Sequence, residues 1–131
     1  MSGQTDEIKQ WIEKADHDLG SAKIIHLHLP DYFDTIAFHC QQAVEKYLKA
    51  LLIFYHIDFL RSHDLIYLLE LLSAEIEIDD SRFKKAFALN NFSVQIRYPN
   101  KIVKLTKEEI ETAIEISQEF RSFAVTIIGT E

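Results

Sequence analysis

The sequence predicts an all-α protein, built as an up-and-down bundle of about five helices in a single domain over residues 1–131. The chain contains only 3 glycines and 2 prolines, whereas β architectures rich in turns need more of both. Hydrophobic residues make up 47% of the chain. In several long segments they recur every three or four residues, which is the period of an amphipathic helix.

Two long helices are expected first, over about residues 6–28 and 32–56. Thr5 is the expected N-cap of the first helix. Pro30 separates the two, because proline does not fit a helix interior. In the second helix, Lys46 and Lys49 lie opposite the apolar face. The apolar stripe of the first helix comprises Ile8, Trp11, Ile12, Ala15, Leu19, Ala22 and His26, and that of the second comprises Phe33, Ala37, Cys40, Val44, Tyr47, Leu48, Leu51 and Tyr55.

The segment "HDLIYLLELL" predicts a third helix, which ends near Leu72 and has Ser62 or His63 near its N-terminus. Its leucines at three- and four-residue spacing form the buried edge. The next segment, "EIEIDD" at residues 75–80, alternates like a β-strand. A single short strand would have no partner in this chain, so we expect an acidic connection here.

The last two helices are predicted mainly from their ends. The fourth covers about residues 81–94 and must end before Pro99, because the residue that precedes a proline is driven toward extended geometry. Its expected buried residues are Phe83, Phe87 and Leu89. The fifth opens at "TKEE", residues 106–109, which is a capping box. Its apolar stripe comprises Ile110, Ala113, Ile114, Ser117, Phe120, Ala124 and Ile127.

Basic residues are distributed unevenly in this acidic chain of net charge −7. Between Arg82 and Lys107 there are seven basic residues and no acid. The net charge argues against indiscriminate binding of nucleic acid, but a local cationic segment can hold a phosphate-bearing ligand or a short RNA. Arg97 stands beside Tyr98 at the expected turn, where its guanidinium fork can bind a phosphate. Alternatively, the lysines are solvated and balanced by acids of other helices.

Several other classes of site are not expected. His26 and His28 lie about 200° apart around a helix, and the chain has no His-Glu-x-x-His motif and one cysteine, so we expect no metal and no cofactor. The N-terminus is polar and acidic, unlike a signal peptide. The longest apolar run, "LIYLLELL", is too short to span a membrane. These features favour a cytoplasmic protein that does not associate with membranes.

Three polar residues in helical positions invite a functional interpretation. His63 would lie at a helix start, where its imidazole could act as a base or donate to a phosphate, or could instead cap the helix or brace the loop. Asp18 and Glu45 flank the apolar stripes of their helices. A partly buried carboxylate needs a cationic partner, and Lys46, Lys49 or Arg97 could supply one. A structural pin between helices is the expected role of such pairs.

The segments "WIEKADHDLGSA", "FHCQQAVEKYLKALL", "HDLIYLL" and "IRYP", in this order and at these separations, resemble the HEPN domain family. The resemblance covers about residues 11–123. It implies a helical bundle, commonly a homodimer, with a groove associated with nucleotide or RNA binding, and relatives that occur beside or fused to nucleotidyltransferases. Many members are ribonucleases that use an Arg-x4–6-His motif without metal, and no arginine of this chain has a histidine at that spacing.

The leading hypothesis is a non-catalytic, dimeric module that interacts with a nucleotide or RNA and pairs with a nucleotidyltransferase, as in a toxin–antitoxin system. Its expected ligand-binding residues are Arg97, Tyr98, Lys46, Lys49 and His63. The first alternative is a metal-independent ribonuclease in which His63 and Arg97 converge. The second is a purely structural helical subunit that docks on a partner through exposed aromatic residues.

Overall fold

The computed structural model describes the backbone of residues 2–97 and 105–129 and the side chains of residues 4–92 and 105–129. The described residues form five helices, which confirms the all-α prediction: α1 (Ser2–His28), α2 (Phe33–Phe54), α3 (Leu65–Leu72), α4 (Asp80–Arg97) and α5 (Lys107–Ile128). No strand occurs in these ranges, and residues 75–79 form a connection as expected. None of the described helices has a stretch long and apolar enough to cross a membrane.

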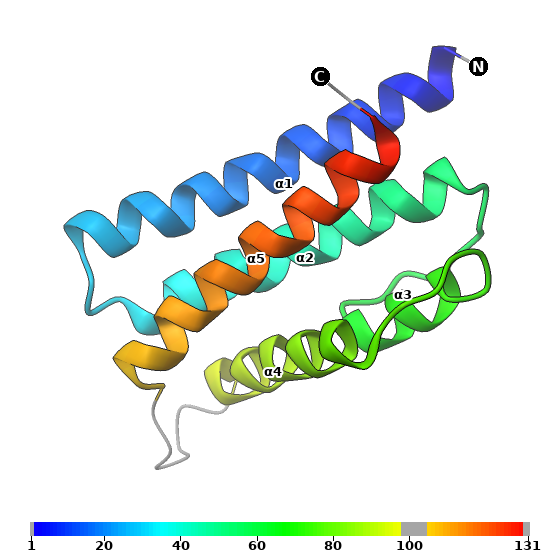
Figure 1. The fold of residues 1–131 in the computed structure, drawn as a ribbon. Coiled ribbons are helices and arrows are strands. Elements are labelled where there is room, and N and C mark those ends of the chain that lie inside the picture. The colour runs from blue at the N-terminus through cyan, green and yellow to red at the C-terminus, as the bar shows by residue number, and fades with distance from the viewer. Residues whose placement is uncertain (1, 98–104, 130–131) are drawn as a thin grey trace.

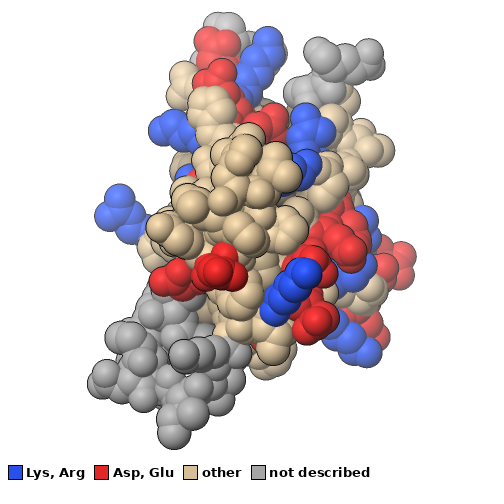
Figure 2. All heavy atoms as spheres, turned by 90° about the vertical axis from the view of Figure 1, so that its left-hand side faces the viewer, with Lys and Arg blue, Asp and Glu red and all other residues tan. Residues whose placement is uncertain are grey.

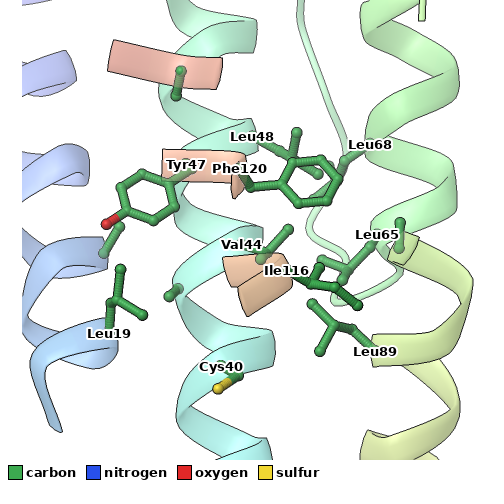
Figure 3. Packing of buried hydrophobic residues seen from close by; sticks show 14 of the residues in the cluster. Leu19, Cys40, Val44, Tyr47, Leu48, Leu65, Leu68, Leu89, Ile116 and Phe120 are labelled. Carbon is green, nitrogen blue, oxygen red and sulfur yellow. The ribbon is translucent and has the colours of Figure 1, made fainter. Parts of the chain in front are cut away.

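Helix α2 is the centre of the bundle, because it contacts all four other helices (Figure 1). α1 and α5 pack on one side of it, and α3 and α4 pack on the other. Its core residues Val44, Tyr47 and Leu48 meet side chains from each neighbour (Figure 3). Thirteen residues of α2 are buried, some of which are polar.

The ends of the helices follow local rules that the sequence partly reveals. The capping box of α5 is confirmed: Thr106 Oγ1 accepts from the Glu109 N–H at 3.1 Å, and the Glu109 carboxylate accepts from the Thr106 N–H at 2.8 Å. The N-cap of α3 is Asp64, so Ser62 and His63 lie near the N-terminus of this helix as predicted. The Asp64 carboxylate also accepts from the Asn90 amide at 2.8 Å, which ties the start of α3 to α4.

Several sequence predictions need correction. α1 already begins at Ser2, so Thr5 is inside the helix and is not its N-cap. His26 is not in the core: its side chain is partly exposed, 4.0 Å from the Glu111 carboxylate. Phe87 is 58% exposed, because α4 turns Ala86, Leu89 and Phe92 inward and residue 87 falls outside that stripe. α4 continues past the expected end at residue 94 and is described as far as Arg97, so the predicted stop before Pro99 lies outside the described residues.

A partly buried polar pin joins the three long helices. The Asp16 carboxylate on α1 accepts hydrogen bonds from the Tyr47 hydroxyl on α2 and from the Arg121 guanidinium on α5, the latter at 2.9 Å. Burial raises the pKa of Tyr47, and the bond to Asp16 raises it further. The same carboxylate raises the pKa of Arg121. Asp16 therefore fixes how α1 and α5 lie on α2.

We predict that Cys40 does not react with thiol reagents in the folded protein. Burial raises the pKa of its thiol from 9.0 to about 12, although a hydrogen bond with Ser117 lowers it, and the thiolate is the reactive form. Because the folded state disfavours the thiolate, the thiol also makes the fold less stable as the pH rises from 9.0 toward about 12. Maleimide labelling at pH 8, followed by mass spectrometry, should be slow in buffer and rapid in denaturing urea. Equally rapid labelling in both conditions would contradict the prediction.

Candidate functional site

Polar residues of α2 gather on one side of the helix, where α1 and the connection between α2 and α3 border it. His39, Gln42, Lys46 and Lys49 are three or four residues apart and therefore share this side. α1 reaches it through Trp11 and Asp18, and the connection reaches it through His63. Two clusters of charged side chains result, each built around one carboxylate.

The first, which we call the Glu45 cluster, consists of Gln41, Gln42, Glu45, Lys49 and His63. The Glu45 side chain is only 4% exposed. Its Oε2 accepts from Lys49 Nζ at 2.9 Å, and its Oε1 lies 2.9 Å from His63 Nδ1. The amides of Gln41 and Gln42 lie farther from Oε1, at 3.5 and 3.4 Å. Both oxygens of the buried carboxylate therefore have partners, as a buried charge requires.

His63 differs from its partner in exposure, because 60% of its side chain is open to solvent. The backbone of this residue is also held, since the Gln41 amide donates to the His63 carbonyl at 2.8 Å. A carboxylate oxygen can only accept a hydrogen bond, so the His63 nitrogen that faces Glu45 carries the proton. The geometry thus fixes Nδ1 against α2 and leaves Nε2 as the ring nitrogen available to a ligand.

The second, the Asp18 cluster, joins α1 and α2 through Asp18, His39 and Lys46. His39 Nδ1 lies 2.8 Å from Asp18 Oδ1, and Lys46 Nζ donates to Oδ2 of the same carboxylate. The Asp18 side chain is 13% exposed. The prediction that Asp18 and Glu45 each need a cationic partner is confirmed, and their partners are Lys46 and Lys49 respectively.

The structure brings together two of the predicted ligand residues, Lys49 and His63, through Glu45. Lys49 was expected on an exposed face, and this was wrong: it is 7% exposed, with its Nζ 5.5 Å from the centroid of the Trp11 ring. Lys46 belongs to the separate Asp18 cluster. Both lysines are paired with carboxylates, so neither offers a free positive charge to a ligand.

Of the other two predicted ligand residues, the structure describes only the backbone of Arg97. Arg97 is the last described residue of α4, and its side chain lies outside the described residues, as does all of Tyr98. The predicted role of these two residues therefore stays a prediction. Within α4, Asn90 donates to Asp64 and accepts from the Leu65 N–H at 3.2 Å, so the helix that carries Arg97 is anchored next to His63.

Part of the basic segment is balanced by acids, as one of the alternatives predicted. Arg82 lies 3.4 Å from the Asp79 carboxylate, and its guanidinium stacks 4.0 Å from the centroid of the Phe123 ring. Lys85 pairs with Glu119 on α5. These cations brace α4 against its surroundings. In the part of the chain that the structure describes, no three His, Cys, Asp or Glu residues are placed to hold a metal ion.

The sequence predicted Lys49 as one possible partner of Glu45 but did not indicate the contact between Glu45 and His63. The two residues are 18 positions apart and meet only because the connection folds back along α2. The available signal was Gln41, a polar residue at the edge of an apolar stripe. Such a residue needs a buried partner, and that partner is the His63 carbonyl.

We predict that Lys49→Met lowers the free energy of unfolding by about 3 kcal/mol, because it leaves the buried Glu45 carboxylate without its cation. The double variant Glu45→Met/Lys49→Met removes both charges and should recover most of this loss, since apolar side chains can replace a buried ion pair at little cost. Urea unfolding of the three proteins measures both effects. A single variant as stable as the wild type, or a double variant less stable than the single, would contradict this energetic account.

Comparison with known proteins agrees with this architecture. The family model described as "HEPN domain" matches residues 8–128. TT1696 of Thermus thermophilus is similar in structure, with 26% identity and a TM-score of 0.78 over 89% of this chain and 94% of that chain. An archaeal HEPN homologue is 23% identical, with a TM-score of 0.75 over 92% of this chain and 97% of that chain. An HEPN domain protein of Thermotoga maritima is 21% identical, with a TM-score of 0.74 over 93% of this chain and 99% of that chain.

No curated protein matches the chain. The family model, however, spans most of the sequence, including α2 and both residues of the Glu45–His63 pair. The chain therefore belongs to the HEPN domain family.

Proposed function

We propose that this HEPN domain protein interacts with a nucleotide or RNA and is the non-catalytic helical partner of a nucleotidyltransferase in a toxin–antitoxin-like pair. The observation that carries the ligand part is the exposed imidazole of His63, held by a buried carboxylate so that one ring nitrogen faces solvent. A ring fixed in this way contacts a ligand without first losing rotational freedom, which favours binding.

The ligand contacts would centre on His63 and Arg97. Asn90 lies beside the start of α3, and Arg97 lies seven residues farther along α4, about 10 Å along the helix axis. The Arg97 guanidinium would bind phosphate, and Tyr98 would stack on a base. Lys46 and Lys49 would contribute less than free lysines do, because each is neutralised by a carboxylate.

An apolar surface supports the partner and homodimer parts of the proposal. Of the seven exposed large hydrophobic residues among those described, five lie on the last turns of α1, the connection to α2 and the first turns of α2: Ile24, Leu27, Leu29, Tyr32 and Phe38. Figure 2 looks onto this end of the bundle and shows a broad area without charged side chains, bordered by acidic and basic ones. Such an area on an acidic chain is where a second copy or a partner protein can approach without charge repulsion.

The Glu45–His63 pair also favours a second candidate, a metal-independent ribonuclease. His63 would take the proton of a ribose 2′-hydroxyl, and the oxygen would form a bond to the neighbouring phosphorus. The bond from phosphorus to the 5′ oxygen would break, and that oxygen would take a proton from water. Arg97 would stabilise the charge on the phosphate in this step.

We predict that a short single-stranded RNA or a nucleotide raises the melting temperature of the wild-type protein. Arg97→Ala should weaken binding about tenfold or more, because it removes a charge-assisted hydrogen bond to phosphate. Arg82→Ala is the matched control, since Arg82 is engaged with Asp79 and Phe123 at the other end of α4. Absence of any shift with nucleotides and RNA, or an equal loss in both variants, would contradict the proposed binding.

Ribonuclease activity makes a different prediction. RNA should be cleaved in the presence of EDTA, and both His63→Ala and Arg97→Ala should abolish cleavage, because one removes the base and the other removes the phosphate contact. Denaturing gels of a labelled single-stranded RNA measure this directly. Intact RNA with the wild-type protein rules out the enzyme and leaves the non-catalytic module; cleavage that survives both substitutions rules out this pair of residues.

A further inference from the structure

The Glu45 cluster joins a buried ion pair to a largely exposed histidine. Lys49 neutralises Glu45, and the two side chains are 9% and 4% exposed. Removing two charges from water is costly, and apolar residues of similar size often serve stability as well or better. The second oxygen of Glu45 is nevertheless committed to His63, whose side chain remains 60% exposed. The contact thus orients the exposed histidine and also satisfies the second oxygen of the buried carboxylate.

Three contacts determine how His63 is oriented. Gln41 holds its carbonyl at 2.8 Å, Asp64 caps the next helix, and Glu45 holds Nδ1 at 2.9 Å. When the imidazole is neutral, its single proton lies on Nδ1, because the carboxylate opposite cannot donate. Nε2 then carries a lone pair and no proton. In that state the nitrogen that a ligand meets accepts a hydrogen bond and cannot donate one.

We propose that Glu45 is a positioning residue that holds neutral His63 as the Nδ1–H tautomer, and that Nε2 accepts a hydrogen bond from a hydroxyl group of the ligand, a ribose 2′-hydroxyl. A phosphodiester has no proton to give to such a nitrogen, whereas the 2′-hydroxyl does, and this hydroxyl is what distinguishes RNA from DNA. The inference rests on the proposed function for the presence of a nucleic-acid ligand. It adds that His63 recognises the sugar, and that Glu45 keeps the proton on Nδ1 so that Nε2 can accept the hydrogen bond.

The tautomer can be measured without any ligand. In long-range 1H–15N spectra of the labelled protein, recorded at a pH high enough for the imidazole to be neutral, His63 should show a protonated Nδ1 and a bare Nε2. In Glu45→Met/Lys49→Met, which removes the carboxylate together with its cation, this preference should disappear. A proton on Nε2 in the wild-type protein, or an unchanged Nδ1–H tautomer in the double variant, would overturn the role assigned to Glu45.

Binding to RNA and DNA oligonucleotides of the same sequence tests the ligand chemistry. We expect the wild type to prefer RNA by about five- to tenfold, the contribution of one hydrogen bond. His63→Ala and the double variant should lose this preference. The control is His17→Ala, which removes an exposed histidine on α1 and should keep the preference for RNA.

The outcomes separate the two proposals. Equal binding of RNA and DNA by the wild type, or a preference for RNA that survives His63→Ala, overturns the hydroxyl contact and leaves the proposed function intact. Binding of neither oligonucleotide contradicts the proposed function and overturns the ligand assignment with it. Loss of the preference in His63→Ala alone, with the double variant unaffected, retains the contact and overturns the positioning role of Glu45.

Discussion

The site depends on one buried carboxylate in the middle of the central helix. Glu45 is tolerated among the apolar residues of α2 because Lys49 lies one turn away and neutralises it. Its remaining oxygen holds the ring of His63, which comes from a different segment of the chain. The burial of Glu45 strengthens its hydrogen bond to His63, because electrostatic interactions are stronger in the protein interior than in water. A carboxylate on an exposed helix would hold the same histidine less firmly.

A carboxylate that binds both a histidine and a lysine occurs a second time, here with the carboxylate on α1. Asp18 also lies between a histidine and a lysine, but all three side chains are at least partly buried between α1 and α2. That cluster joins two helices, as the Asp16 pin does on the other flank of α1. Only His63 combines a well-buried partner with a largely exposed ring among the described histidine–carboxylate pairs. The candidate site therefore differs from the structural contacts in the exposure of its histidine ring, and not in the pairing of that ring with a carboxylate.

The sequence predicted the features that depend on residues close to one another in the chain. The five helices and the capping box at Thr106 follow from spacing and from local hydrogen bonding. It did not predict the burial of Lys49 or the contact between Glu45 and His63, because both depend on how distant segments pack on α2. Phe87 shows the same limit, since hydrophobicity suggested burial and the orientation of α4 exposes it.

A crystal structure of the protein with a short single-stranded RNA tests the central claim most directly. The account predicts a ribose 2′-hydroxyl about 2.7–3.2 Å from His63 Nε2, with Nδ1 still bonded to Glu45. RNA bound at another face of the bundle would contradict it. So would a His63 ring that has turned away from Glu45 while it contacts the RNA.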